Sequence, residues 1–422
     1  MAYITSQVGL IFLWGAVLGV GIQWFLNMEI ERYTLATGET ALTGFNRYWK
    51  YWGLVFVVMV YLQNLWPGWA TSSATMLTYL FGGDPTVIAI GMLLVIGAAL
   101  TLAPVIYVAL ERLIFLKVAV IGLFLIVAIF AVIKGSSYES LPDAVTNFGH
   151  VPTELGLALV MGAIAFAGAG GGQNLAQSNW IRDKGFGMGR YHPRLVSPVT
   201  GRRDEAGSET AGYVFEPTEE NLARWRRWWR FANIEQASSF VLVTIITITF
   251  TSLIAHTAVF GKPGLENSID FLEVEGNELK SIVGPWFGTL FWAVGAFSLF
   301  AAAVGIVDYA SRLSADILKT TYLRRSRLSE SKLYFGLVWS LVGIGILVLL
   351  VGIDQPLVLL VISACVAGAM MFMYSLLLLL INRRSLPEQI RVRGVRAGVL
   401  VFSFAFFGLL SLTIEEQAGK LF

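Results

Sequence analysis

The sequence predicts an all-α, polytopic membrane protein. Hydrophobic residues make up 56% of the 422 residues and charged residues only 14%, whereas a soluble domain carries about 25% charged residues. Apolar runs long enough to cross a hydrocarbon layer of about 30 Å recur along the whole chain. These runs are too long and too unbroken for barrel strands, so helices are the expected spanning elements.

Ten spans can be placed on the apolar runs. The chain 1–422 then forms one transmembrane domain, in which 185–230 is the large soluble segment. The expected spans are residues 8–27, 52–81, 85–106, 109–134, 154–181, 231–258, 282–311, 332–352, 356–381 and 394–414.

The basic residues fix an orientation for these spans. Every second connection is rich in Lys and Arg, and together these connections hold 26 of the 30 basic residues. The positive-inside rule places them in the cytoplasm, with the loop 185–230 among them and the C-terminus outside. Met1 would then begin outside, almost directly on a span, so the pattern predicts one further helix before residue 1.

The span that contains Met161–Asp183 is interrupted in its middle. Each mid-helix glycine costs about 1 kcal/mol of helix propensity relative to alanine. Backbone freed inside a bilayer survives only where it lines a protein or water-filled cavity, and such a break is a pointer to a transporter's binding site. Close packing of helices through small residues is the alternative. The candidate site residues are Gly168, Gly170, Gly171, Gly172, Gln173 and Asn174.

Other polar residues also fall within spans. Gln63 and Asn64 precede Pro67 in the second span, where they either line a pathway or join helices. Asp308, Arg312 and Asp316 follow one another at four-residue spacing, which favours ion pairs along one helix face. Asp308 is also the remaining candidate for proton or cation coupling.

Two further segments have both a structural and a functional interpretation. Glu29 and Glu31 end the first span, either as a solvated helix end or facing an inner vestibule. A helix at 218–230, with Thr218 as its N-cap, carries tryptophans and arginines that suit the inner membrane surface. That position argues against nucleic-acid binding by the same basic residues.

The broken span resembles the Nramp family of divalent-metal transporters. The family motif Met-Pro-His-Asn-Leu matches the stretch that ends in Gln173-Asn174-Leu175. The order and spacing of most other spans are similar. The stretch LNMEIERYTLATGETALTGF and the RWRRWW segment resemble a bacterial branch of Nramp-related proteins. The resemblance implies a LeuT-like inverted repeat, an inner bacterial membrane, and family helices two to eleven in the ten spans, with the unwound first helix missing.

The sequence also departs from the family pattern. Gly171 stands where the family has a methionine, Gln173 stands where it has a histidine, and the usual acid of the third helix has no counterpart near Trp66–Trp69. Thioether ligands favour softer metals, whereas oxygen ligands suit harder ones. The sequence therefore does not decide whether this chain has the family's usual metal selectivity or its proton coupling.

The function expected from these observations is secondary transport of a divalent cation of the Mn/Fe/Mg class by alternating access. The alternatives are transport of amino acids or other small solutes on the same fold, or an inactive, N-terminally truncated fragment. An enzyme is disfavoured, because the three histidines are not paired at metal-ligand spacing and HExxH and GxSxG are absent. We expect the bilayer, the cation and protons as partners, and no cofactor, nucleic acid or obligate protein partner.

Overall fold

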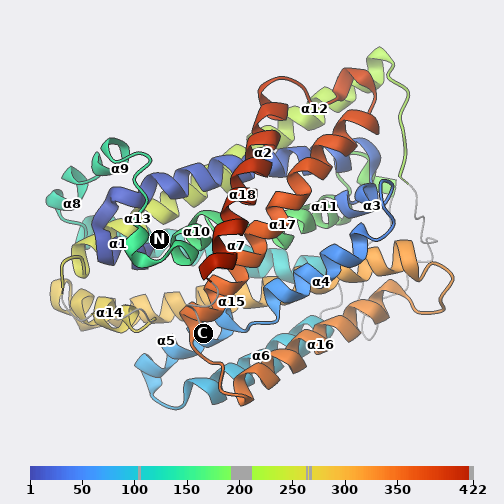
Figure 1. The fold of residues 1–422 in the computed structure, drawn as a ribbon. Coiled ribbons are helices and arrows are strands. Elements are labelled where there is room, and N and C mark those ends of the chain that lie inside the picture. The colour runs from blue at the N-terminus through green and yellow to red at the C-terminus, as the bar shows by residue number, and fades with distance from the viewer. Residues whose placement is uncertain (103–105, 192–211, 263–264, 266–268, 418–422) are drawn as a thin grey trace.

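The computed structural model describes residues 1–102, 106–191, 212–262, 265 and 269–417. These residues form helices and connecting segments, and the described part of the chain contains no strand. Eight helical segments in it are long and apolar enough to cross a membrane. The broken pair α10–α11 and the C-terminal helix α18 complete a bundle of ten segments, in the order that the sequence predicts (Figure 1).

The helical segments have the following bounds. The first runs through α1 (Ala2–Val8), a 3₁₀ turn (Gly9–Phe12) and α2 (Leu13–Thr37), so it begins earlier and ends later than expected. The second is divided into α4 (Trp52–Asn64) and α5 (Gly68–Phe81), with Pro67 at the predicted kink. The remaining segments are α6 (Pro85–Leu102), α7 (Ile106–Ala131), α10 (Leu157–Ala165) with α11 (Gly172–Lys184), α13 (Val243–Ala258), α15 (Pro285–Ile317), α16 (Glu330–Leu350), α17 (Pro356–Arg384) and α18 (Val395–Gln417).

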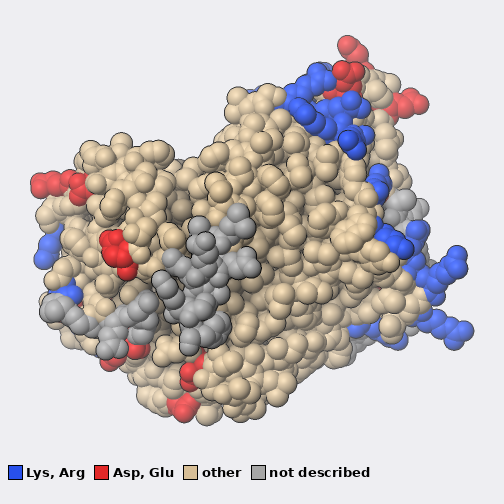
Figure 2. Space-filling view, in the orientation of Figure 1, with Lys and Arg blue, Asp and Glu red and all other residues tan. Residues whose placement is uncertain are grey.

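Shorter helices cap the two ends of the bundle. At one end lie α3 (Ala41–Phe45) and the projecting α12 (Glu219–Glu235), and at the other lie α8 (Gly135–Glu139), α9 (Asp143–Thr146) and α14 (Phe271–Ile282) (Figure 1). Lys and Arg side chains gather at the end that carries α12, whereas acidic side chains dominate at the opposite end (Figure 2). We call these the basic end and the acidic end. The charge asymmetry of the sequence is thus an asymmetry of the folded surface.

The basic helix α12 differs from the expected surface helix at 218–230. It does begin after Thr218, whose side chain accepts a hydrogen bond from the Asn221 amide at 3.3 Å. It then runs on through a π-helical turn, Gln236–Leu242, into α13 without interruption. Trp225 and Trp229 stack on each other, and the Arg32 guanidinium lies 4.2 Å from the centre of the Trp229 ring. These two tryptophans therefore pack on the protein. Residues 192–211 of the expected cytoplasmic loop lie outside the described residues.

Candidate functional site

The predicted break in the fifth span is present between Ala165 and Gly172. Gly168, Gly170 and Gly171 adopt positive φ angles of 115°, 75° and 61°, a region that residues with a Cβ rarely enter. A Cβ would also lie 2.4 Å from the Ala165 carbonyl oxygen at Gly170, and 2.6 Å from a ring atom of Phe240 at Gly168. Glycine is thus required here both for the backbone angle and for the close approach of neighbouring groups.

A glutamine from α2 holds the broken backbone in place. The Gln23 Oε1 accepts hydrogen bonds from the amides of Ala169 and Gly170, both at 2.9 Å. Its Nε2 donates to the Ala165 carbonyl oxygen, also at 2.9 Å. The sequence interpretation missed Gln23, although an amide in the middle of an apolar run was the signal by which it selected Gln63 and Asn64.

A second glutamine, Gln63 of α4, holds the other side of the break. Its Oε1 accepts a hydrogen bond from the Gly172 amide at 3.0 Å, and its Nε2 donates to the Tyr309 hydroxyl at 3.3 Å. Tyr309 in turn donates to the Asn64 Oδ1 at 2.7 Å. Of the two predicted roles for Gln63 and Asn64, these contacts fit the joining of helices.

A cavity of about 670 Å³ opens beside the break. Its wall is built from α2, α5, α7, α11, α12 with the π-helical turn that follows it, and α15. Gly168, Ala169 and Gln173 line it at the break, and Gln177, Ile181 and Lys184 line it along successive turns of α11. The cavity therefore follows α11 from the break in the direction of α12 and the basic end.

The structure divides the predicted site residues into two groups. Gly168, Gln173 and Asp308 line the cavity. Asn174 does not, because neighbouring positions on a helix point about 100° apart; it is 1% exposed and lies beside the Tyr374 hydroxyl. The remaining predicted residues also do not line the cavity: Gly170, Gly171, Gly172, Gln63 and Asn64.

The backbone groups at the break are used unequally. The amides of Ala169, Gly170 and Gly172 all donate to glutamine oxygens. The carbonyl oxygens of residues 166–169 accept no hydrogen bond from any described residue. Phe166, Gly168 and Ala169 also line the cavity. Three amides at the break are therefore already bonded, whereas these four carbonyl oxygens have no partner among the described residues.

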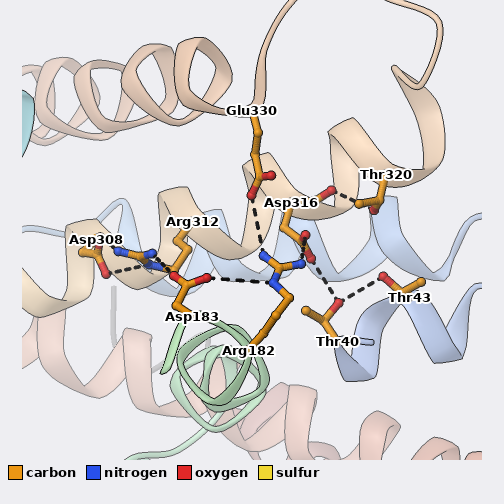
Figure 3. Close-up of polar contacts among 9 residues, drawn as sticks. All are labelled: Thr40, Thr43, Arg182, Asp183, Asp308, Arg312, Asp316, Thr320 and Glu330. Carbon is orange, nitrogen blue, oxygen red and sulfur yellow. Dashed lines mark hydrogen bonds and ion pairs between the residues drawn. The ribbon is translucent and has the colours of Figure 1, made fainter. Parts of the chain in front are cut away.

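A buried ion network joins α11 to α15 and α16 (Figure 3). The predicted pair Asp308–Arg312 is present at 2.9 Å, and Arg312 also binds Asp183. The expected pair between Arg312 and Asp316 was wrong, because Asp316 turns to Arg182 of α11 at 2.5 Å. Asp308 further accepts a hydrogen bond from the Tyr334 hydroxyl at 2.8 Å. Arg182 adds an ion pair with Glu330 at 3.7 Å, and Thr40 donates to Asp316 at 3.0 Å.

The described side chains alone do not form a metal-binding site. Among the described residues, no group of three or more His, Cys, Asp and Glu side chains is arranged to hold a metal ion.

Comparison with known proteins identifies the fold. No family model matches the sequence, and no curated protein matches it. Two solved structures of the manganese transporter from Eremococcus coleocola, a histidine-to-alanine and a glutamate-to-alanine mutant, superpose with TM-scores of 0.68 and 0.69. Each has 11% identical residues over 97% of this chain and 81% of the transporter chain. The chain has the LeuT-like fold of these transporters.

A third structure supports the same assignment. It is the same transporter in complex with an aromatic bis-isothiourea compound, and it matches 100% of this chain and 82% of its own with a TM-score of 0.63 and 10% identity. The fold that the broken span and the span order predicted is therefore confirmed. At this identity the superposition establishes the fold, and the chemistry has to be argued from this chain's own residues.

Proposed function

We propose that this protein is a secondary transporter that moves a divalent metal cation by alternating access, with its binding site at the break between α10 and α11. The observation that carries the proposal is the unequal use of the backbone there. Three amides of the break are bound by Gln23 and Gln63, whereas the carbonyl oxygens of residues 166–169 have no partner among the described residues. Carbonyl and carboxamide oxygens are ligands for hard cations.

The same observation weakens the alternative of amino acid transport. In that alternative, a substrate carboxylate would bind the N–H groups at the start of a half-helix. The Gly172 amide at the start of α11 already donates to Gln63, and the amides of Ala169 and Gly170 in the break donate to Gln23. A carboxylate that bound these three amides would have to displace both glutamines, whereas a cation would displace neither.

The oxygen-only ligands favour a hard metal within the proposed class. Among the described residues no thioether lines the cavity, and Gln173 is the cavity-lining carboxamide next to the break. We therefore infer a preference for magnesium or manganese over softer metals, and the manganese transport named for the structural neighbours supports the divalent class.

Proton coupling through Asp308 would require the ion network to open. Asp308 is fully buried and is bound by Arg312 and Tyr334. We propose that it remains part of this network while a cation occupies the break. We further propose that the basic end faces the cytoplasm of a bacterial cell.

Uptake into liposomes that contain the purified full chain tests the proposal. We expect uptake of Mn²⁺ or Mg²⁺ that falls at least tenfold in Gln173→Ala. Asn174→Ala is the matched control, because it removes the adjacent carboxamide, which does not line the cavity. Uptake of labelled amino acids without uptake of either cation would overturn the proposal.

A further inference from the structure

Two carboxylates lie near each other on the cavity wall, away from the break. Glu31 is in α2, near its inner end, and Glu235 is the last residue of α12. Both line the cavity, and they lie close enough for the charge of Glu235 to act on Glu31. Glu31 is only 4% exposed, so its charge is largely removed from water.

Neither carboxylate is neutralised by a basic side chain. Glu31 and Glu235 take part in no ion pair among the described residues. Glu29, two positions before Glu31, shows the contrast, since it binds Arg32 at 2.7 Å and Arg396 at 3.5 Å. A buried carboxylate without a positive partner is costly, and Glu31 has the second, partly buried carboxylate of Glu235 beside it. The two negative charges together favour the binding of a cation.

Two glutamines complete this part of the wall. The Gln177 Nε2 donates to Glu31, and the Gln236 Nε2 donates to Glu235 at 3.2 Å. The Gln236 side chain, in a residue that is 8% exposed, also contacts Glu31. Its Oε1 is buried and has no hydrogen-bond partner among the described residues. Because buried polar atoms in folded proteins are nearly always bonded, this oxygen is a candidate ligand for a bound group.

We propose that Glu31, Glu235, Gln177 and Gln236 form a second binding site, for a hard divalent cation such as Mg²⁺ or Mn²⁺, in the same cavity. Two carboxylates balance the charge of one divalent cation. The Gln236 Oε1 is already without a partner among the described residues. The Gln177 carboxamide can turn about its terminal bond, so that its oxygen replaces its N–H₂ group toward the cation. Four oxygen ligands, with water at the remaining positions, suit both ions.

The position of this site gives it a role on the transport path. Gln173 at the break and Gln177 lie one helical turn apart on α11, a rise of about 6 Å. The neutral oxygens of the break would release a cation readily, and the charged pair would receive it on the way to the basic end. This role rests on the proposed function, whereas cation binding by the two glutamates does not.

Direct binding to the full chain in detergent tests the inference. Mn²⁺ is titrated and free Mn²⁺ is followed by electron paramagnetic resonance, with Mg²⁺ as competitor. We expect the double variant Glu31→Gln/Glu235→Gln to bind one Mn²⁺ fewer per chain, or to bind it at least tenfold more weakly. Glu111→Gln is the matched control, because Glu111 lines the same cavity but pairs with Lys184, and it should bind Mn²⁺ as the unchanged chain does.

A second measurement separates loss of the site from loss of the fold. Mn²⁺ should raise the unfolding temperature of the unchanged chain and of Glu111→Gln by a larger amount than that of the double variant. Unchanged Mn²⁺ stoichiometry and affinity in a folded double variant would overturn the inference. Failure of the proposed function alone would appear as absent uptake together with Mn²⁺ binding that still depends on the two glutamates.

Discussion

The side chain of Gln23 is bonded to the backbone of Gly170 and its neighbours. One glutamine from α2 accepts two amides and donates to one carbonyl oxygen of a different span, each at 2.9 Å. The break between α10 and α11 is therefore a fixed structure, because its irregular backbone is bonded from outside the helix. The same contacts determine which backbone groups at the break are already hydrogen-bonded.

Replacement of Gln23 should destabilise the protein. In Gln23→Leu, the amides of Ala169 and Gly170 lose their acceptor, and a buried group without a partner costs about 1–3 kcal/mol. We expect a lower unfolding temperature in detergent and loss of cation uptake in liposomes. Gln7→Leu is the control, because Gln7 bonds only to the adjacent Ser6 at 3.3 Å and should leave both measurements unchanged.

Alanine at Gly171 should be poorly tolerated. The residue has φ of 61°, and a Cβ would lie 2.6 Å from the Gln63 Oε1 and 2.8 Å from Ala367. With ψ of −126°, this backbone conformation is sparsely populated by residues with a Cβ and costs about 1–3 kcal/mol, and displacement of Gln63 would free the Gly172 amide. The unfolding temperature of Gly171→Ala should be clearly lower than that of the unchanged chain. Gly343→Ala, where a Cβ meets nothing within 4 Å, should unfold at or above the original temperature.

The buried ion network predicts a large effect at Arg312. Its side chain is fully buried between Asp183 and Asp308, and removal of one partner of a buried pair costs about 3–5 kcal/mol. Arg312→Met should lower the free energy of unfolding by that amount. Arg224→Met breaks a pair with Glu220 in which both side chains are mostly exposed, so its effect should stay below about 1 kcal/mol. Equal effects would contradict burial of the network.

Glu275 should make stability depend on pH. It lies in α14 between two spans, is 2% exposed, and burial raises its pKa from 4.5 to about 8. Between these values the unfolded chain loses the proton and the folded chain keeps it, so stability should fall as pH rises from about 4.5 to about 8. The unfolding temperature of Glu275→Gln should lack this fall. Glu278→Gln, one turn away and paired with Lys262, should retain it.

The orientation can be tested by labelling single cysteines in intact cells. In a Cys365→Ser background, Ser140→Cys at the acidic end should react with a membrane-impermeant maleimide. Arg224→Cys, on the exposed face of α12 at the basic end, should react only after the cells are opened. The reverse pattern would place the basic end outside, against the positive-inside rule.

Most of the fold could be predicted because hydropathy and charge are local signals. The ten segments follow the apolar runs, and the kink at Pro67 and the break after Ala165 occur at the expected residues. For α12 the sequence predicted a helix that begins after Thr218, which the structure contains, but not the packing of Trp229 on Arg32, which is far away in the sequence. The position of its exposed face at the membrane surface stays a prediction.

The candidate site could be predicted only as a stretch of sequence. Gln173 and Asn174 have similar side chains and adjacent positions. On α11, however, Gln173 points to the cavity and Asn174 points into the packed interior. Asp316 had an arginine at the favourable spacing on its own helix, yet Arg182 of another helix is its partner. Spacing along a helix identifies possible neighbours and carries no information about competing partners from elsewhere.

By itself the sequence determined that this is a helical membrane protein with a broken fifth span and one basic end. Those features depend on the bilayer, which excludes free backbone and charge wherever they occur in a chain. Only the tertiary structure decided that Gln23 and Gln63 take the amides of the break, that its carbonyl oxygens remain beside a cavity, and that Glu31 meets Glu235 there. These relationships join residues of different spans, and their energies depend on distances that arise only when the spans pack.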